Sequence, residues 1–259
     1  MHKIEVNSKN IRTDLILEQN NRRKTSLFQE EKEGIKVTKQ EENKCHYTTI
    51  EFQDITDHME TEKVQEVLLK ELKEYIKPSK KDRYLIVGLG NPKSTPDSLG
   101  PKTLDEIIVT RYLFSIEKIE DYANVAILKP DVYGNTGIES ISLIKSMIKE
   151  VKPTKVIAID ALKAGKLERL VKTIQITDSG IHPGSGILND RGEISEKTMN
   201  CKVIAIGIPT VVDKNTMIEK ASTDNFMVTP TNIDFLIERL SKLLGNTLNN
   251  VIHKTNFDK

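Results

Sequence analysis

The feature of this sequence that most limits its fold is a regular alternation of short apolar segments with amphipathic ones. The expected strands are "YLIVGLG", "NVAILKP", "KVIAID", "TIQITD" and "KVIAIGIPT". The expected helices cover about 102–114 and 138–151, the segment "ALKAGKLERL", and a last helix that starts near Thr231. Short, continuously apolar strands that alternate with helices are typical of a sheet buried on both faces. The sequence therefore predicts an α/β fold with a mostly parallel sheet and helices on both faces.

Residues 1–44 differ from the rest because they are crowded with Lys, Glu, Asn and Gln. Their runs "QEEKEG" and "TKQEENK" indicate solvated chain with little packed core. Beyond them, "YTTIEF" predicts a strand, and apolar residues at helical spacing from Val64 to Ile76 predict a helix that Pro78 ends. We therefore expect a polar N-terminal extension over 1–44 and a single α/β domain over 45–259.

Composition excludes several classes of partner. The 39 Lys and Arg residues nearly balance the 38 Asp and Glu residues, so no global field attracts nucleic acid. No apolar run is long enough to cross a bilayer, and the first residues contain no apolar signal-peptide core. Cys45 and Cys201 have neither the spacing of metal ligands nor the number that a disulfide framework needs. We expect a cytoplasmic protein without a metal, a cofactor, a membrane or a nucleic acid as direct partner.

Polar residues follow each predicted strand of the sheet. Ligands of open α/β sheets bind outside the carboxyl ends of the strands, so these residues are the candidates for a site. They are Asn91, Asp97, Asp131, Asp160, Asp178, His182, Thr210 and Asp213. Position alone does not choose among the aspartates.

Asp97 and Asp160 are expected at the same edge of the sheet, where two carboxyl groups can share a proton. One carboxylate then activates a water as general base, while the protonated partner polarises a carbonyl or protonates the leaving group. The alternative is structural: Asp160 caps the following helix, and Asp97 stabilises a turn beside Pro96. His182 stands alone among glycines and a proline, which favours a hydrogen bond within its loop over a metal or a general-base role.

Gly88-Leu89-Gly90 at the end of the first strand suggests a phosphate-binding turn. The third glycine of that pattern is missing, because position 93 is Lys, and no Gly-Lys-Ser/Thr sequence closes the loop. The glycines are better interpreted as a tight strand exit that leads to Asp97.

A set of longer segments covers most of the chain. They are "RTDLILE", "VGLGN", "TPDSLGP", "VTRYLF", "GNTGIES", "VIAIDAL", "TIQITDSGIHPGSG", "VIAIGIPTVVD" and "VTPTNID", in this order from Arg12 onward. With them the chain resembles the spore germination proteases, which degrade small acid-soluble spore proteins. The segment "TIQITDSGIHPGSG" is too long and specific to match by chance.

The resemblance implies an atypical aspartic endopeptidase with a fold similar to hydrogenase-maturation endopeptidases. Its catalytic aspartates lie in Thr-Pro-Asp and Ala-Ile-Asp segments, which correspond to Asp97 and Asp160. Asn91, His182 and Thr210, which follow the predicted strands, are expected as supporting or substrate-binding residues. Small acid-soluble spore proteins would be the substrates, and the forespore or spore core would be the compartment.

The family resemblance also implies an inactive homotetrameric zymogen that processes its own N-terminus. The matching segment "RTDLILE" places the cleaved bond between Asp14 and Leu15, so that about residues 1–14 form the pro-segment. An acidic residue followed by an apolar one in a polar tail suits an extended protease substrate.

Two departures from the family pattern leave other functions open. Ile16 stands where the family has Ala, which bears on processing efficiency. The segment between Asp213 and Met227 is shortened, which bears on oligomer contacts or zymogen control. The alternatives are a catalytically silent homologue that binds spore proteins or their DNA complexes, and a metal-dependent hydrolase.

Overall fold

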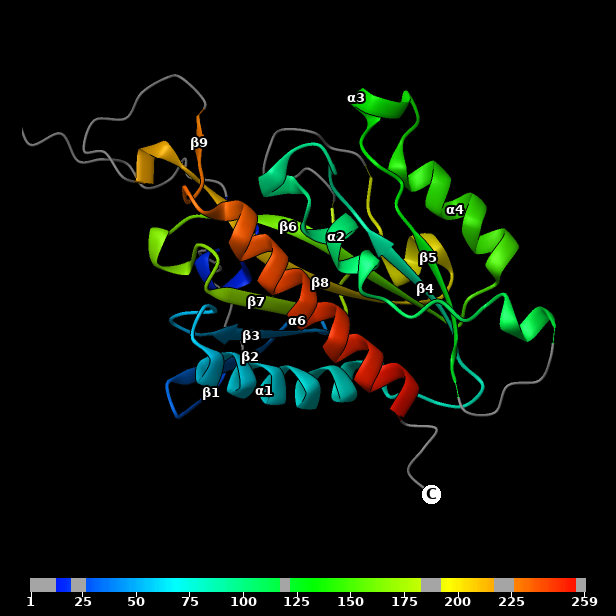
Figure 1. Cartoon of the computed structure of the whole chain (residues 1–259), viewed down its shortest axis with the longest axis horizontal. Helices are drawn as coiled ribbons and strands as arrows, with labels where there is room; N and C mark the ends of the chain where they lie inside the picture. The colour runs from blue at the N-terminus through cyan, green and yellow to red at the C-terminus, as the bar shows by residue number, and fades with distance from the viewer. Residues whose placement is uncertain (1–12, 20–26, 117–121, 183–191, 217–225, 255–259) are drawn as a thin grey trace, which may run out of the picture.

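The computed structural model describes residues 13–19, 27–116, 122–182, 192–216 and 226–254. Within these ranges one sheet has the strand order β1-β2-β3-β7-β8-β6-β4-β5, with β9 paired to β8 (Figure 1). The strands are β1 Leu27–Lys32, β2 Ile35–Glu42, β3 Cys45–Glu51, β4 Arg83–Gly88, β5 Asn124–Leu128, β6 Lys155–Ala164, β7 Thr173–Thr177, β8 Lys202–Asp213 and β9 Met227–Val228.

Helices cover both faces of this sheet. The α-helices are α1 His58–Ile76, α2 Leu99–Asp105, α3 Tyr133–Thr136, α4 Ser140–Val151, α5 Glu196–Met199 and α6 Ile233–Lys254. One buried apolar cluster joins α1, α2 and α6 to the sheet, and a second joins α4 and α5 to the other face. In Figure 1, α6 crosses the sheet diagonally, with α1 below it and α4 at the right of the view. The prediction of an α/β fold with helices on both faces is confirmed.

The sheet is mixed, so the prediction of a mostly parallel sheet is wrong. The pairs β4–β5, β4–β6 and β6–β8 are parallel, but the remaining five pairs are antiparallel. Tight turns at Glu33-Gly34 and Asn43-Lys44 join β1, β2 and β3, and all four residues have positive φ, as hairpin turns that match strand twist require. The connection from β6 to β7 is too short for a helical crossover, so β7 is antiparallel to its neighbours β3 and β8.

Two segments that were predicted to be helices differ in the structure. The segment "ALKAGKLERL" is not a helix, because β6 continues to Ala164 in register with β8 and is followed only by the 3-10 turn η5 Leu167–Arg169. The helix expected over 102–114 ends at Asp105 as α2, because the N–H groups of Thr110 and Arg111 instead donate to the carbonyl of Val125. The 3-10 turn η4 Leu113–Ser115 follows.

Part of residues 1–44 belongs to the core, contrary to the expectation of little packing there, although β1 is exposed along its whole length. Leu15, Ile16, Ile35 and Val37 are buried. The reason is that β2 lies between β1 and β3 and contributes Ile35 to the large apolar cluster, which Leu15 also joins. The division of the chain at residue 44 stays a prediction. None of the described helices combines the length and the hydropathy that crossing a bilayer demands.

Candidate functional site

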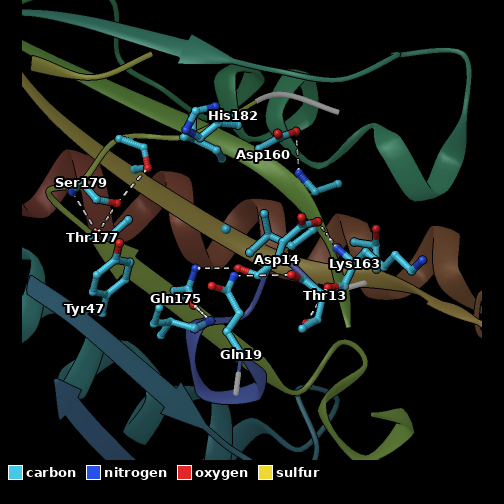
Figure 2. Close-up of a pocket in the computed structure, with 18 of the residues that line it drawn as sticks. Thr13, Asp14, Gln19, Tyr47, Asp160, Lys163, Gln175, Thr177, Ser179 and His182 are labelled. Carbon is cyan, nitrogen blue, oxygen red and sulfur yellow. Dashed lines mark hydrogen bonds between the residues drawn. The ribbon is translucent and has the colours of Figure 1, made fainter. Parts of the chain in front are cut away.

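A cavity of about 960 Å³ lies beyond the carboxyl end of β4, at the edge where polar strand exits were predicted (Figure 2). Its lining includes Ala205 and Gly207 of β8, and Leu162 of β6 packs so closely over Gly207 that a Cβ atom there would lie 2.4 Å from the Leu162 Cδ1 atom. Asp160 of β6 and Gln175 of β7 are both in register with Gly207. Their side chains therefore stand on one face of the sheet, on either side of this glycine.

Asp97 reaches the cavity from the 3-10 turn η3 Thr95–Asp97, which follows β4. The chain turns at Gly90, whose φ is +108°, and a Cβ atom there would lie 2.0 Å from the Asp97 carbonyl oxygen. The Asn91 N–H group donates to the Asp97 carboxylate at 2.9 Å. The glycine thus permits the close approach, and the Asn91 backbone orients the carboxylate.

Asp160 is buried, with 7% of its surface exposed, and its carboxylate accepts a hydrogen bond from the Ala161 N–H group at 2.9 Å. Burial raises the pKa of Asp160 well above its ordinary value of 3.8, and the negative charges of Asp97 and Asp14 raise it further. Because the charged form is disfavoured for all three reasons, this carboxyl group holds a proton that its surroundings make hard to remove. The alternative role as a helix cap is wrong, since β6 continues past it.

We expect Asp160→Asn to stabilise the fold at pH 7. The unfolded chain releases the Asp160 proton near pH 3.8, whereas the folded chain retains it to a higher pH. Folding therefore loses stability as pH rises from about 3.8 to the raised pKa of the folded state, and Asn escapes this loss because it does not ionise. Thermal unfolding across acidic and neutral pH should show a higher melting temperature for Asp160→Asn at pH 7. The difference should shrink toward pH 3.8, and parallel curves for the two proteins would contradict the burial argument.

The segment around the expected cleavage site lies in the same cavity. Thr13, Asp14 and Ile16 line it together with Asp97 and Asp160. The backbone of Leu15 is extended, with φ −81° and ψ 124°, and the 3-10 turn η2 Ile16–Glu18 follows it. Asp14, the residue before the expected cleavage point, therefore lines the same cavity as the two predicted catalytic aspartates.

Asp14 is held by Lys163 of β6 through two backbone groups. The Asp14 N–H group donates to the Lys163 carbonyl at 3.0 Å, and the Lys163 N–H group donates to the Asp14 carboxylate at 2.8 Å. A carboxylate at this position is thus recognised by a main-chain donor. Leu15, the next residue, is fully buried in the large apolar cluster.

Glu18 anchors the far end of the segment. Its carboxylate accepts from the Thr13 hydroxyl and the Gly165 N–H group and pairs with Arg169 at 3.2 Å. The Leu15 N–H group also donates to the Thr13 hydroxyl oxygen at 3.1 Å. These contacts fix the segment on both sides of the bond between residues 14 and 15.

Lys163 is the main departure from sequence reasoning near the site. The segment "ALKAGKLERL", which contains it, was expected to be a helix, but Lys163 lies on β6, where its side chain is buried and pairs with Asp213 at 3.2 Å. A buried cation needs a charged partner, and Asp213 is the partner of Lys163. Asp213 does not line the cavity. The apolar residues Ala161 and Leu162 after Asp160 were the signal that the strand continues and that Lys163 is buried.

The other predicted residues are distributed unevenly around the cavity. His182 lines it and is exposed, and Thr210 lines it and is buried (Figure 2 shows His182 close to Asp160). Asn91 is outside the lining, and its side chain accepts from Asn135 at 3.0 Å.

Two of the alternative aspartates also lie outside the cavity lining. Asp131 bonds the side chain of Asn135 at 2.9 Å, and Asp178 bonds the His46 ring at 2.8 Å. Both carboxylates therefore have structural partners on neighbouring segments, which suits a role in holding loops.

Gln175 was not singled out from the sequence. It is a lone amide within the apolar strand "TIQIT", and that contrast was the available signal. Its side chain accepts from the Ile16 N–H group at 2.8 Å and donates to the Asp14 carbonyl at 3.3 Å. Figure 2 shows Gln175 beside Asp14, facing the same space as Asp160. Among the described residues, no group of three His, Cys, Asp or Glu side chains is gathered closely enough to hold a metal ion.

Comparison with known proteins decides the family. A family model described as germination protease matches residues 2–223, which include the segment around Asp14, Asp97 and Asp160. The chain belongs to the germination protease family. The germination protease of Bacillus velezensis is 46% identical over 194 residues, and that of Bacillus subtilis is 45% identical over 194 residues. The germination protease of Priestia megaterium is 40% identical over 233 residues.

The matches to these germination proteases cover most of this chain and a smaller part of the relatives. They cover 72% of the chain for the B. velezensis and B. subtilis proteins and 83% for the P. megaterium protein. The same matches cover 52%, 52% and 60% of the relatives. The chain therefore spans little more than half the length of the curated germination proteases it matches.

Proposed function

We propose that this chain is an endopeptidase of spore germination that cuts itself between Asp14 and Leu15 and then degrades small acid-soluble spore proteins. The observation that carries the proposal is that Asp14, Asp97 and Asp160 line one cavity. Membership of the germination protease family supports the same activity. The homotetramer, the spore-core location and the likeness to hydrogenase-maturation endopeptidases stay predictions from the resemblance.

Protonation assigns different roles to the two aspartates. Because the pKa of Asp160 is raised, Asp160 is the acid and Asp97 the base. Asp97 takes a proton from water, and the water oxygen attacks the Asp14 carbonyl carbon. Asp160 gives its proton to the Leu15 nitrogen as the carbon–nitrogen bond breaks. The new carboxyl group of Asp14 then releases its proton, and transfer of a proton from Asp97 to Asp160 restores the pair.

The contacts of Asp14 suggest which substrates follow. The Lys163 N–H group donates to the Asp14 carboxylate, and such a hydrogen bond is strongest when the acceptor oxygen is charged, so it favours an acidic residue before the cleaved bond. The buried position of Leu15 favours an apolar residue after it. An acidic–apolar pair in an extended segment of a spore protein would meet both requirements after residues 1–14 have left and Leu15 has moved out of its buried position.

Intact-mass spectrometry of the purified full chain tests the proposal. We expect a fragment that begins at Leu15 to accumulate, and we expect an added small acid-soluble spore protein to be cut after an acidic residue. A catalytically silent homologue would leave both masses intact. Inhibition by exhaustive chelation, with a bound metal found, would favour a metal-dependent hydrolase instead.

A further inference from the structure

The strongest unassigned feature of the cavity is the side chain of Gln175. It is only 8% exposed and lies on β7, in register with Gly207 and across that residue from Asp160. We infer that Gln175 is a catalytic residue that stabilises the oxygen of the cleaved carbonyl while it holds the Asp14–Leu15 bond in place. The inference rests on the proposed cleavage of that bond.

The hydrogen bonds define which atom of the amide faces which backbone group. The Ile16 N–H group is a donor, so the atom that meets it at 2.8 Å is the Gln175 oxygen. The Gln175 nitrogen then points to the Asp14 carbonyl oxygen at 3.3 Å. One planar amide therefore contacts the backbone on both sides of the bond between residues 14 and 15.

This geometry suits the charge that develops during hydrolysis. When the water oxygen bonds to the Asp14 carbonyl carbon, negative charge moves to the carbonyl oxygen. An N–H donor already directed at that oxygen stabilises the charge without reorganising, and the bond shortens from its length in the uncut chain. The cavity also contains Asp14, Asp97 and Asp160, which repel the developing charge or, in the case of Asp160, are committed to the leaving nitrogen. The neutral N–H donor of Gln175 is therefore the group that stabilises the charge on the Asp14 carbonyl oxygen.

The rigidity of the amide follows from its surroundings. Gln175 belongs to an interior strand, where β3 and β8 flank β7. Its oxygen is fixed by Ile16, which is 5% exposed and buried against the core. The donor nitrogen is thereby held toward the carbonyl, as an oxyanion-stabilising group requires.

The test uses the full chain and the first-order rate at which the fragment beginning at Leu15 appears. Gln175→Met keeps the length of the side chain and removes both hydrogen bonds. We expect its rate to fall about 10²- to 10³-fold, as for loss of one donor to an oxyanion. Thr173→Val is the matched control, since Thr173 is a buried residue on the same face of β7 outside the cavity, and its rate should stay within about twofold of the parent chain.

Gln175→Glu separates catalysis from placement. Glu keeps the oxygen that accepts from Ile16 but replaces the donor with a second, negatively charged oxygen. If Gln175 stabilises the carbonyl oxygen, Gln175→Glu should be as slow as Gln175→Met or slower. A Gln175→Glu rate close to that of the parent chain would overturn the inference, because backbone placement alone would then suffice. If Gln175→Met does not fold, the cleavage rate of Gln175→Glu is compared with that of Thr173→Val instead.

The outcomes also distinguish the inference from the function on which it rests. Cleavage that depends on Asp97 and Asp160 but is unaffected in both Gln175 variants would overturn the role of Gln175 alone. Absence of cleavage between Asp14 and Leu15 in the parent chain would overturn the proposed function and the role of Gln175 together.

Discussion

Asp97→Asn and Asp160→Asn should each lower the rate of self-cleavage between Asp14 and Leu15 by about 10²- to 10⁴-fold, the usual contribution of a general acid or base. Asn can neither take a proton from water nor give one to the Leu15 nitrogen. The two residues act as a unit around one proton, so the double variant should be little slower than either single variant. Mass spectrometry of timed samples gives the three rates.

Asp178→Asn is the matched control for this experiment. Asp178 also follows a predicted strand, but it bonds His46 and does not line the cavity. Its rate should stay within about twofold of the parent chain, because its carboxylate faces neither the water nor the bond. A loss in Asp178→Asn equal to that in Asp160→Asn would mean that the wrong pair of strand exits has been chosen. Full activity in either Asp97→Asn or Asp160→Asn would remove the acid–base pair from the mechanism.

Gly90→Ala should lower the rate of self-cleavage about 10²-fold and lower stability together. Its Cβ atom would lie 2.0 Å from the Asp97 carbonyl oxygen, and real Cβ contacts essentially never fall under 3.0 Å. The turn that carries Asp97 must therefore move by roughly 1 Å, and a displacement of this size at a catalytic group costs about 10²-fold in rate. The positive φ of +108° adds backbone strain. Self-cleavage rates and melting temperatures measure both effects.

Gly34→Ala separates the crowding at Gly90 from the strain of a positive φ. Gly34 has φ +85° in the turn between β1 and β2, and a Cβ atom there meets nothing within 4 Å. It should cost about 1–2 kcal/mol of unfolding free energy and leave the cleavage rate within about twofold of the parent chain. If Gly90→Ala cleaves as fast as Gly34→Ala, the close approach at Gly90 does not position Asp97.

Local patterns in the sequence predicted the elements of the fold well and their directions poorly. Apolar runs located the strands β4, β5, β6, β7 and β8, and helical spacing located α1 and α6. The direction of β7 was missed because "ALKAGKLERL" has apolar residues at helical spacing, although β6 continues through Ala164 by pairing with β8. Strand pairing between distant segments decided this case, and periodicity alone does not report it.

The site was predictable to the extent that it depends on strand ends. The rule that ligands bind there made Asp97 and Asp160 candidates, and both line one cavity, although Asp160 lies within β6 and not at its end. The docking of residues 13–18 was not predictable, because it depends on Lys163, Gln175 and Arg169. These partners are separated from residues 13–18 by about 150 residues in the sequence. The single apolar run Leu15-Ile16-Leu17 in a polar segment gave no indication that Leu15 joins the core.

Hydrolysis in ¹⁸O-labelled water, followed by mass spectrometry after one turnover, tests most directly whether the aspartate pair activates water. The account predicts that the fragment ending at Asp14 gains one labelled oxygen atom, and that peptides containing Asp97 and Asp160 gain none. An unlabelled Asp14 fragment, or label in Asp97 or Asp160, would contradict it, because an aspartate oxygen would then have attacked the carbonyl carbon.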